Sequence, residues 1–264
     1  MTTRPRPSFP ARLDSSASPS RAVNQHTSND AALHSPLSRP MTRPAVHGLG
    51  LDSQAVRHNM VRKLAADGIA DVRVLAAMGT IERHRFVDTA LVNQAYEDTS
   101  LPIGLGQTIS KPGVVSRMAE LLLNGRTDKL GRVLEIGTGC GYQAAVLSLL
   151  ATEVYSIERL RGLHDKAREN LRTLRLPNVH LLFGDGMVGF AKGAPYAAII
   201  AAAGGEAVPQ AWIDQLAVGG RLVATVMSGE RAKQALMVID KTPGGLRQMV
   251  METVHFVPLK SGIA

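Results

Sequence analysis

The feature that most constrains this chain is a glycine-rich turn between two apolar segments, Arg132-Val-Leu-Glu-Ile-Gly-Thr-Gly-Cys-Gly-Tyr142. The pattern predicts a buried strand over 133–136 and a helix over 142–151. A strand that ends in glycines and restarts as a helix lets a ligand approach the backbone closely, and we expect it to present free backbone N–H groups. A dinucleotide fingerprint would need its third glycine where Tyr142 stands, so a nicotinamide-dependent oxidoreductase is disfavoured.

A second strand, predicted over 153–158, ends in an acid. Glu158 follows Gly137 by about 20 residues, the spacing of a ribose-binding carboxylate in a nucleoside-binding βαβ unit. An ionised carboxylate accepts hydrogen bonds from two adjacent hydroxyls. The alternative is that Glu158 only starts the next helix, where an acid suits the helix dipole.

The alternation of helix and strand continues along most of the chain. An acid at the carboxyl end of a parallel strand faces the ligand crevice, so Asp185 could accept a hydrogen bond from an adenine amino group; a simple turn is the alternative. A helical prelude precedes the glycine turn, and Asp71 is expected to cap its second helix. The predicted helices are 54–66, 72–78, 89–96, 113–123, 160–174 and 208–216; further strands are 180–185, 196–203 and 221–226, and 234–240 with 253–259 form a closing hairpin around Pro243-Gly244-Gly245.

Residues 101–112 hold two glycines and two prolines, which predicts an irregular loop rather than a strand or a helix. In one interpretation Gln107, Thr108 and Ser110 form a donor cluster that faces a substrate. In the other, Ser110 caps the helix that begins near Pro112. The residues alone leave both open.

Charge and composition limit the partners. The formal net charge is +8 with a pI near 10.0, yet six arginines lie in residues 1–50. Residues 1–52 are a Pro/Ser/Arg-rich leader that cannot bury enough surface to offset its ordering entropy, although its composition overlaps that of organellar transit peptides. Residues 53–264 form the predicted domain. Aromatic residues make up 4%, too few for base stacking, so a nucleic-acid site is not indicated.

Cys140 is the only cysteine, which excludes an internal disulfide and favours a reducing compartment. It is either a reactive thiol at a helix N-terminus or a small side chain that fills a crowded turn. The histidines are not clustered, so we expect no metal site. No apolar run approaches about 18 residues, so we expect no membrane span.

Several motifs together resemble the protein-L-isoaspartate O-methyltransferases, a family of class I methyltransferases, over about four-fifths of the chain. The glycine turn alone indicates a methyltransferase, and the Gly-Gln-Thr-Ile-Ser loop is specific to this family. The motifs are Ala76–Val87 with Phe86-Val87, Leu101-Pro-Ile-Gly, Gly106-Gln-Thr-Ile-Ser110, Val133–Gln143, Gly184-Asp-Gly186 and Phe256-Val-Pro-Leu259.

The resemblance implies an α/β fold, a doubly wound, Rossmann-like seven-stranded sheet with a helical N-terminal region. It implies S-adenosylmethionine as cofactor and isoaspartyl-containing proteins and peptides as substrates. The free α-carboxylate of L-isoaspartate is methylated, and the ester cyclises spontaneously to a succinimide that can open to aspartate. It places Ser110 as the active-site serine, with Gln107, Thr108 and Ile109 around it as cofactor-binding residues; Gly137, Thr138 and Gly139 line the methionine part, Glu158 the ribose, and Asp185 with Gly186 the adenine.

The chain departs from the family pattern in two places. Ala201-Ala-Ala-Gly-Gly205 replaces a more polar segment, and Ala197 stands where an acid is common; both are expected near the crevice. The leader has no counterpart in that pattern. We expect a cytoplasmic monomer. The rival hypotheses are a class I methyltransferase of another substrate, such as a small molecule or RNA, and a catalytically weak binder of damaged protein or polyanions.

Overall fold

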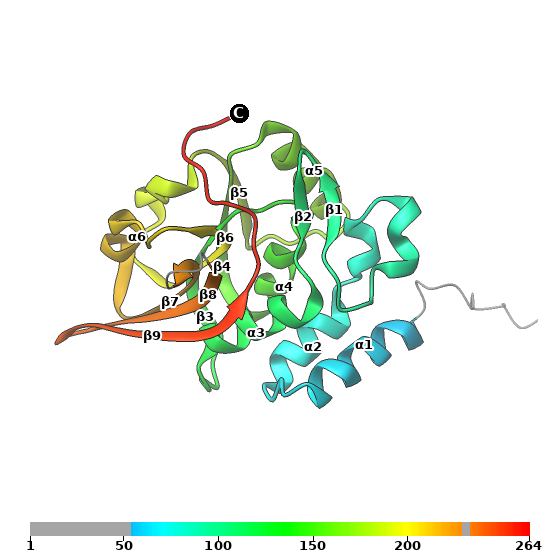
Figure 1. The fold of residues 1–264 in the computed structure, drawn as a ribbon, viewed down its shortest axis with the longest axis horizontal. Helices are drawn as coiled ribbons and strands as arrows, with labels where there is room; N and C mark the ends of the chain where they lie inside the picture. The colour runs from blue at the N-terminus through cyan, green and yellow to red at the C-terminus, as the bar shows by residue number, and fades with distance from the viewer. Residues whose placement is uncertain (1–53, 229–232) are drawn as a thin grey trace, which may run out of the picture. The chain divides into compact units, whose positions relative to one another are not determined.

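The computed structural model describes residues 54–228 and 233–264 (Figure 1). They belong to one compact unit. The predicted leader, and its boundary with the domain at 52/53, lie outside the described residues and stay predictions.

The helices are α1 (Gln54–Ala66), α2 (Val72–Thr80), α3 (Pro112–Leu123), α4 (Tyr142–Leu150), α5 (Arg161–Arg172) and α6 (Gln210–Gln215), with 3-10 turns η1 (Arg83–Phe86), η2 (Thr89–Gln94), η3 (Gly186–Val188) and η4 (Ala191–Gly193). The strands are β1 (Leu101–Gly104), β2 (Gln107–Ile109), β3 (Leu130–Ile136), β4 (Ala151–Glu158), β5 (Val179–Phe183), β6 (Tyr196–Gly205), β7 (Leu216–Ser228), β8 (Lys233–Thr242) and β9 (Gly245–Val254).

The central sheet has seven strands in the order β5-β4-β3-β6-β7-β8-β9. Strands β3 to β7 pair with one another in parallel, and β8 and β9 extend the sheet from β7 as antiparallel strands. The chain builds outward from β3 through β4 to β5, then returns to place β6 on the other side of β3. This doubly wound topology confirms the expected fold. It creates a switch point between β3 and β6, where ligands bind in such sheets.

Both faces of the sheet are buried because successive side chains of a strand point to opposite sides. Val133 and Ile200 pack with the buried residues of α1–α5 on one face. Leu134 and Ile199 pack on the other face with Trp212 of α6. Near-continuous apolar runs such as 196–203 therefore reflect a strand covered on both sides.

Two predicted element boundaries are confirmed in detail. Asp71 caps α2, since its carboxylate accepts hydrogen bonds from Arg73 N and Val74 N. Pro112 begins α3, where a proline costs no hydrogen bond.

The prediction of an irregular loop over 101–112 is wrong. Strands β1 and β2 form an antiparallel hairpin in which Leu101 pairs with Ile109. Leu105 and Gly106 turn the chain with positive φ angles of 52° and 69°. The hairpin is stabilised by the burial of alternate residues, Leu101, Ile103 and Ile109, a pattern too short to stand out among the glycines and prolines.

The closing hairpin agrees with the prediction in its turn but not in its returning strand. The turn lies at Pro243-Gly244, but the returning strand is β9, residues 245–254, rather than 253–259. Most of β9 is exposed, so its sequence lacks the apolar alternation by which a strand is recognised. Residues 255–259 instead leave the sheet and run toward the carboxyl ends of the parallel strands.

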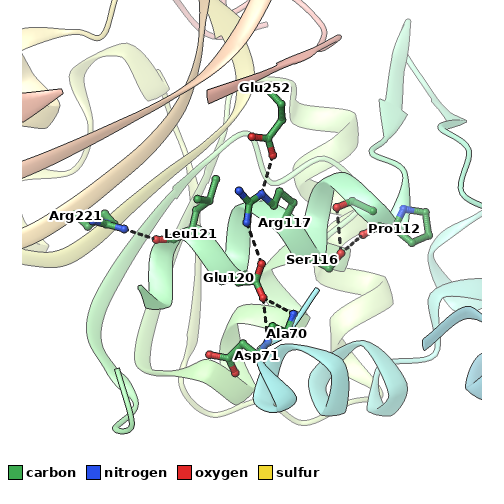
Figure 2. A network of polar contacts seen from close by, with 10 residues as sticks. Ala70, Asp71, Pro112, Ser116, Arg117, Glu120, Leu121, Arg221 and Glu252 are labelled. Carbon is green, nitrogen blue, oxygen red and sulfur yellow. Dashed lines mark hydrogen bonds and ion pairs between the residues drawn. The ribbon is translucent and has the colours of Figure 1, made fainter. Parts of the chain in front are cut away.

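A polar network ties the helical prelude and β9 to α3 (Figure 2). Arg117 of α3 donates to Glu252 of β9 (2.7 Å) and to Glu120 (3.0 Å). The other oxygen of Glu120 accepts hydrogen bonds from Ala70 N (2.6 Å) and Asp71 N (2.9 Å). One carboxylate thus satisfies two backbone donors before α2 as well as a neighbouring guanidinium.

Replacing Glu120 by alanine should lower the free energy of unfolding by about 1–3 kcal/mol, because two backbone N–H groups lose their acceptor and Arg117 keeps only Glu252. Glu169→Ala is the matched control, since Glu169 is exposed and pairs with Arg172 of its own helix. Its cost should stay below about 0.5 kcal/mol. Urea unfolding measures both, and equal losses would show that Glu120 contributes no more than a surface ion pair.

Candidate functional site

A cleft of about 240 Å³ opens at the carboxyl ends of β3, β4 and β6, at the switch point of the sheet. The hairpin β1–β2 forms one wall, and residues 257–260 form another. Its lining includes most of the residues predicted for the site: Gln107, Thr108, Ile109, Ser110, Gly137, Thr138, Gly139, Glu158 and Gly186.

The glycine turn forms the floor of this cleft. Gly137, Gly139 and Gly141 have positive φ angles of 89°, 56° and 91°, which favour glycine. The expectation of free N–H groups is wrong for most of the turn. Gly137 N and Thr138 N donate to Ile157 O, and Gly139 N donates to Glu158 Oε2. The turn therefore offers close backbone approach rather than a row of vacant donors.

Glu158 is buried at the end of β4 and lines the cleft. Its two oxygens accept hydrogen bonds from Gly139 N (2.9 Å) and Leu160 N (2.9 Å). Each carboxylate oxygen can accept a second hydrogen bond, so ribose hydroxyls remain possible partners. Glu158 also holds Leu160, the residue that precedes α5, and its role at the ribose stays a prediction.

A buried polar chain lies beneath the turn. Thr138 Oγ1 contacts Ser156 Oγ (2.6 Å), and Ser156 Oγ donates to Glu135 Oε2 (2.5 Å). Complete burial raises the pKa of Glu135 to about 8, although the hydrogen bond from Ser156 and the nearby Gln143 amide oppose the shift. Glu135 is therefore largely protonated at neutral pH.

Buried atoms without partners show whether the cleft fits the expected cofactor. Gln143 Nε2 is a buried donor with no hydrogen bond among the described residues, and Gln143 lines the cleft. A Cβ at Gly186 would lie 2.6 Å from Ile136 Cγ2, so only glycine fits there. Glu158 adds a negative charge suited to a cationic ligand. These residues fit S-adenosylmethionine, which offers ribose hydroxyls, a polar amino-acid group and a positive charge.

The Gln107–Ser110 segment belongs to the cleft wall rather than to the cap of α3. Lys111, not Ser110, is the N-cap residue, and no side chain caps this end. Ser110 is half-buried, and its hydroxyl makes no hydrogen bond to another described residue. The interpretation of Ser110 as a helix cap is therefore wrong, and its hydroxyl is available to a ligand.

Cys140 is a packing residue. It is buried, and desolvation raises the pKa of its thiol to about 11, so it carries almost no thiolate at neutral pH. The alternative of a reactive thiol is not supported.

Asp185 lies beside the cleft but does not line it. Its oxygens accept hydrogen bonds from Met187 N (2.8 Å) and from Gly262 N (2.6 Å) of the C-terminal segment. The same segment returns to Arg159, whose carbonyl oxygen accepts from Ala264 N. Its predicted role at the adenine stays a prediction, and any adenine there would share Asp185 with this segment.

Residues of the C-terminal segment were missed as part of the site. Val257, Pro258, Leu259 and Lys260 line the cleft. Gly204 N of β6 donates to Val257 O, and Leu259 N donates to Gly204 O. The Phe256–Leu259 motif was a signal of the family, but nothing in it indicated which way the chain would run.

The two departures from the family pattern lie at opposite ends of β6. Ala202 and Ala203 line the cleft, as expected. Ala197 does not lie near it: a Cβ at Gly131 would contact the Ala197 side chain at 3.2 Å, at the amino end of the strands. The acid that is common at position 197 in the family would therefore lie far from the site.

Metal-binding groups or membrane-spanning helices among the described residues would indicate other classes of protein. No group of histidine, cysteine and acidic side chains among them could hold a metal ion. No helix among them is long and apolar enough to cross a membrane.

The doubly wound sheet, the glycine turn and the acid at the end of β4 define a class I methyltransferase that uses S-adenosylmethionine. Residues 55–264 match the family model of protein-L-isoaspartate(D-aspartate) O-methyltransferase. The chain therefore belongs to this family.

Individual relatives agree with the family assignment. A protein-L-isoaspartate O-methyltransferase of Methylibium petroleiphilum is 55% identical over 98% of this chain and 97% of its own, so its match includes much of the leader. One from Leptothrix cholodnii is 59% identical over 86% of this chain and 82% of its own. A solved protein-L-isoaspartate O-methyltransferase has a TM-score of 0.71 at 28% identity, covering 78% of this chain and 67% of that one. A Plasmodium falciparum structure, solved with S-adenosyl-L-homocysteine, shares the fold at a TM-score of 0.65 and 22% identity, over 77% and 98% of the two chains.

Glu135→Gln should change how stability depends on pH. The native state keeps the Glu135 proton up to about pH 8, whereas the unfolded chain loses it near 4.5, so this residue makes stability fall as pH rises between these values. Relative to wild type, the variant should gain more than about 1 kcal/mol between about pH 5 and about pH 9.

Urea unfolding at the two pH values measures this gain. Glu97→Gln is the control, because Glu97 is exposed and its side chain has no partner among the described residues. Parallel pH profiles for wild type and Glu135→Gln would show that Glu135 titrates alike in both states.

Proposed function

We propose that the cleft described above is where this enzyme transfers the methyl group, and that Ser110 orients the acceptor. The protein methylates the free α-carboxylate of L-isoaspartyl residues with S-adenosylmethionine. The observation that supports the proposal most directly is the free Ser110 hydroxyl in a cleft that also contains Glu158 and the glycine turn. Among the described residues that line the cleft, Glu158 is the only one with a carboxylate. This carboxylate and the polar groups around it suit a nucleoside.

The acceptor needs little activation. An α-carboxylate has an ordinary pKa near about 3.5 and is ionised at neutral pH, so its oxygen is already nucleophilic. Bound S-adenosylmethionine supplies an electrophilic methyl group on a positively charged sulfur. The chain's contribution is to hold the carboxylate in line with the methyl group and to exclude water.

The residues are assigned roles on this basis. The Ser110 hydroxyl donates a hydrogen bond to one carboxylate oxygen, which leaves the other free to attack. Gln107, Thr108 and Ile109 hold the cofactor from the hairpin side, and Gly137–Gly139 allow its methionine part to approach the backbone. Glu158 accepts from the ribose, and Asp185 with Gly186 border the adenine. The buried Thr138–Ser156–Glu135 chain keeps the turn in place from below.

The direct test is methyl transfer to two synthetic peptides that differ only in one L-isoaspartyl or L-aspartyl linkage. Base-labile label on the isoaspartyl peptide alone is expected, because only that linkage leaves the α-carboxylate of the residue free. Equal labelling of both peptides, or none with the cofactor bound, would contradict the proposal.

Ser110→Ala should lower kcat by about tenfold or more while leaving the Kd of S-adenosylmethionine within about twofold, since the lost hydrogen bond serves the acceptor. Glu158→Gln is the reciprocal variant, which should weaken cofactor binding. Isothermal titration and steady-state kinetics separate the two effects. Loss of cofactor affinity in Ser110→Ala would contradict the assigned role.

A further inference from the structure

A second groove, of about 850 Å³, adjoins the cleft at Ser110. Its walls come from the turn between α1 and α2, the start of α3, and the last residues of β9 with Phe256. Ser110 is the only described residue that lines both hollows. An acceptor whose carboxylate reaches Ser110 from the side opposite the cofactor would therefore extend along this groove.

The cations of the groove are matched by carboxylates. Lys111 Nζ lies 3.3 Å from Asp98, and both side chains are about half exposed. Arg117 pairs with Glu252 in the groove and with Glu120 behind it (Figure 2). A bound peptide would therefore meet little net positive charge from these side chains.

Asp67 remains as an unmatched acid. It is exposed in the turn after α1, and its carboxylate makes no hydrogen bond or ion pair with another described residue. If His255 is counted as neutral, the described residues that line the groove include three carboxylates and two cations. A negative excess is notable on a chain with a formal net charge of +8.

We propose that this groove holds the residues that flank the isoaspartyl site, and that Asp67 gives it a preference for basic over acidic flanking side chains. The inference rests on the proposed function, since it takes Ser110 as the place where the acceptor carboxylate lies. The polypeptide continues beyond the methylated residue and must leave the cofactor cleft, and the groove begins where that residue would lie. Lys111 follows Ser110 in the chain and pairs with Asp98, whereas the unmatched acid belongs to a separate wall.

The effect should be modest because the groups are exposed. Ion pairs of exposed side chains contribute little, so a single flanking charge should change kcat/KM by about two- to fivefold. The preference should shrink as salt is added, because ions screen exposed charges.

The test uses the full-length enzyme and three isoaspartyl peptides that carry lysine, glutamine or glutamate at the flanking positions, placed on either side in separate sets. In at least one set kcat/KM should fall from lysine to glutamine to glutamate. Asp67→Asn should reduce the lysine-to-glutamate ratio, and D67K should invert it. Asp128→Asn is the matched control, an exposed acid that lines neither hollow, and should keep the wild-type ratio.

The outcomes separate the two proposals. If no isoaspartyl peptide is methylated although the cofactor binds, the proposed function fails. If all are methylated at equal kcat/KM, or if the Asp67 variants keep the wild-type ratio, the groove does not select flanking charge and the inference is overturned. Cofactor affinity of each variant, measured by titration, reports whether the fold is intact.

Discussion

Glu158 joins the ends of two neighbouring parallel strands, and the site depends on this connection. One of its oxygens accepts from Gly139 N after β3, and the other accepts from Leu160 N after β4. The adjacent carbonyl of Ile157 accepts from Gly137 N and Thr138 N. These bonds hold the glycine turn against the end of β4 and set the start of α5. The same carboxylate therefore builds the floor of the cleft, and each of its oxygens can still accept a second hydrogen bond.

Two buried acids near the turn have different partners. Glu158 accepts hydrogen bonds from two backbone N–H groups. Glu135 is fully buried and receives its hydrogen bond from Ser156, and its pKa is raised to about 8. Neither is placed as a general base, and methylation of an ionised carboxylate requires none. The chain accordingly positions the reactants. The hairpin β1–β2 and the C-terminal segment form walls of the cleft, and α3, held through Arg117 and Glu120, begins two residues after Ser110.

Much of the fold could be predicted from the sequence because its signals are local. The apolar runs of β3, β4 and β6, the Asp71 cap and the Pro112 start of α3 each depend on a few adjacent residues. The hairpin β1–β2 was missed because only three buried residues distinguish it from a loop. Strand β9 was misplaced because it is mostly exposed and is held by pairing with β8 rather than by burial. Of the predicted site residues, all but Asp185 line the cleft, yet the expectation of free N–H groups in the turn was wrong.

The sequence by itself determined the βαβ unit, the glycine turn and the alternation of strands and helices from β3 to β7, because backbone conformation and alternation of burial are properties of neighbouring residues. The tertiary structure alone decided which polar groups remain free. Gly139 N donates to Glu158, Asp185 accepts from Gly262 N, and Ser110, between two hollows, has no partner among the residues that the structure describes. The reason is physical: a hydrogen bond needs its donor and acceptor within about 3 Å, and for these groups the partner comes from a distant part of the chain that only packing brings close.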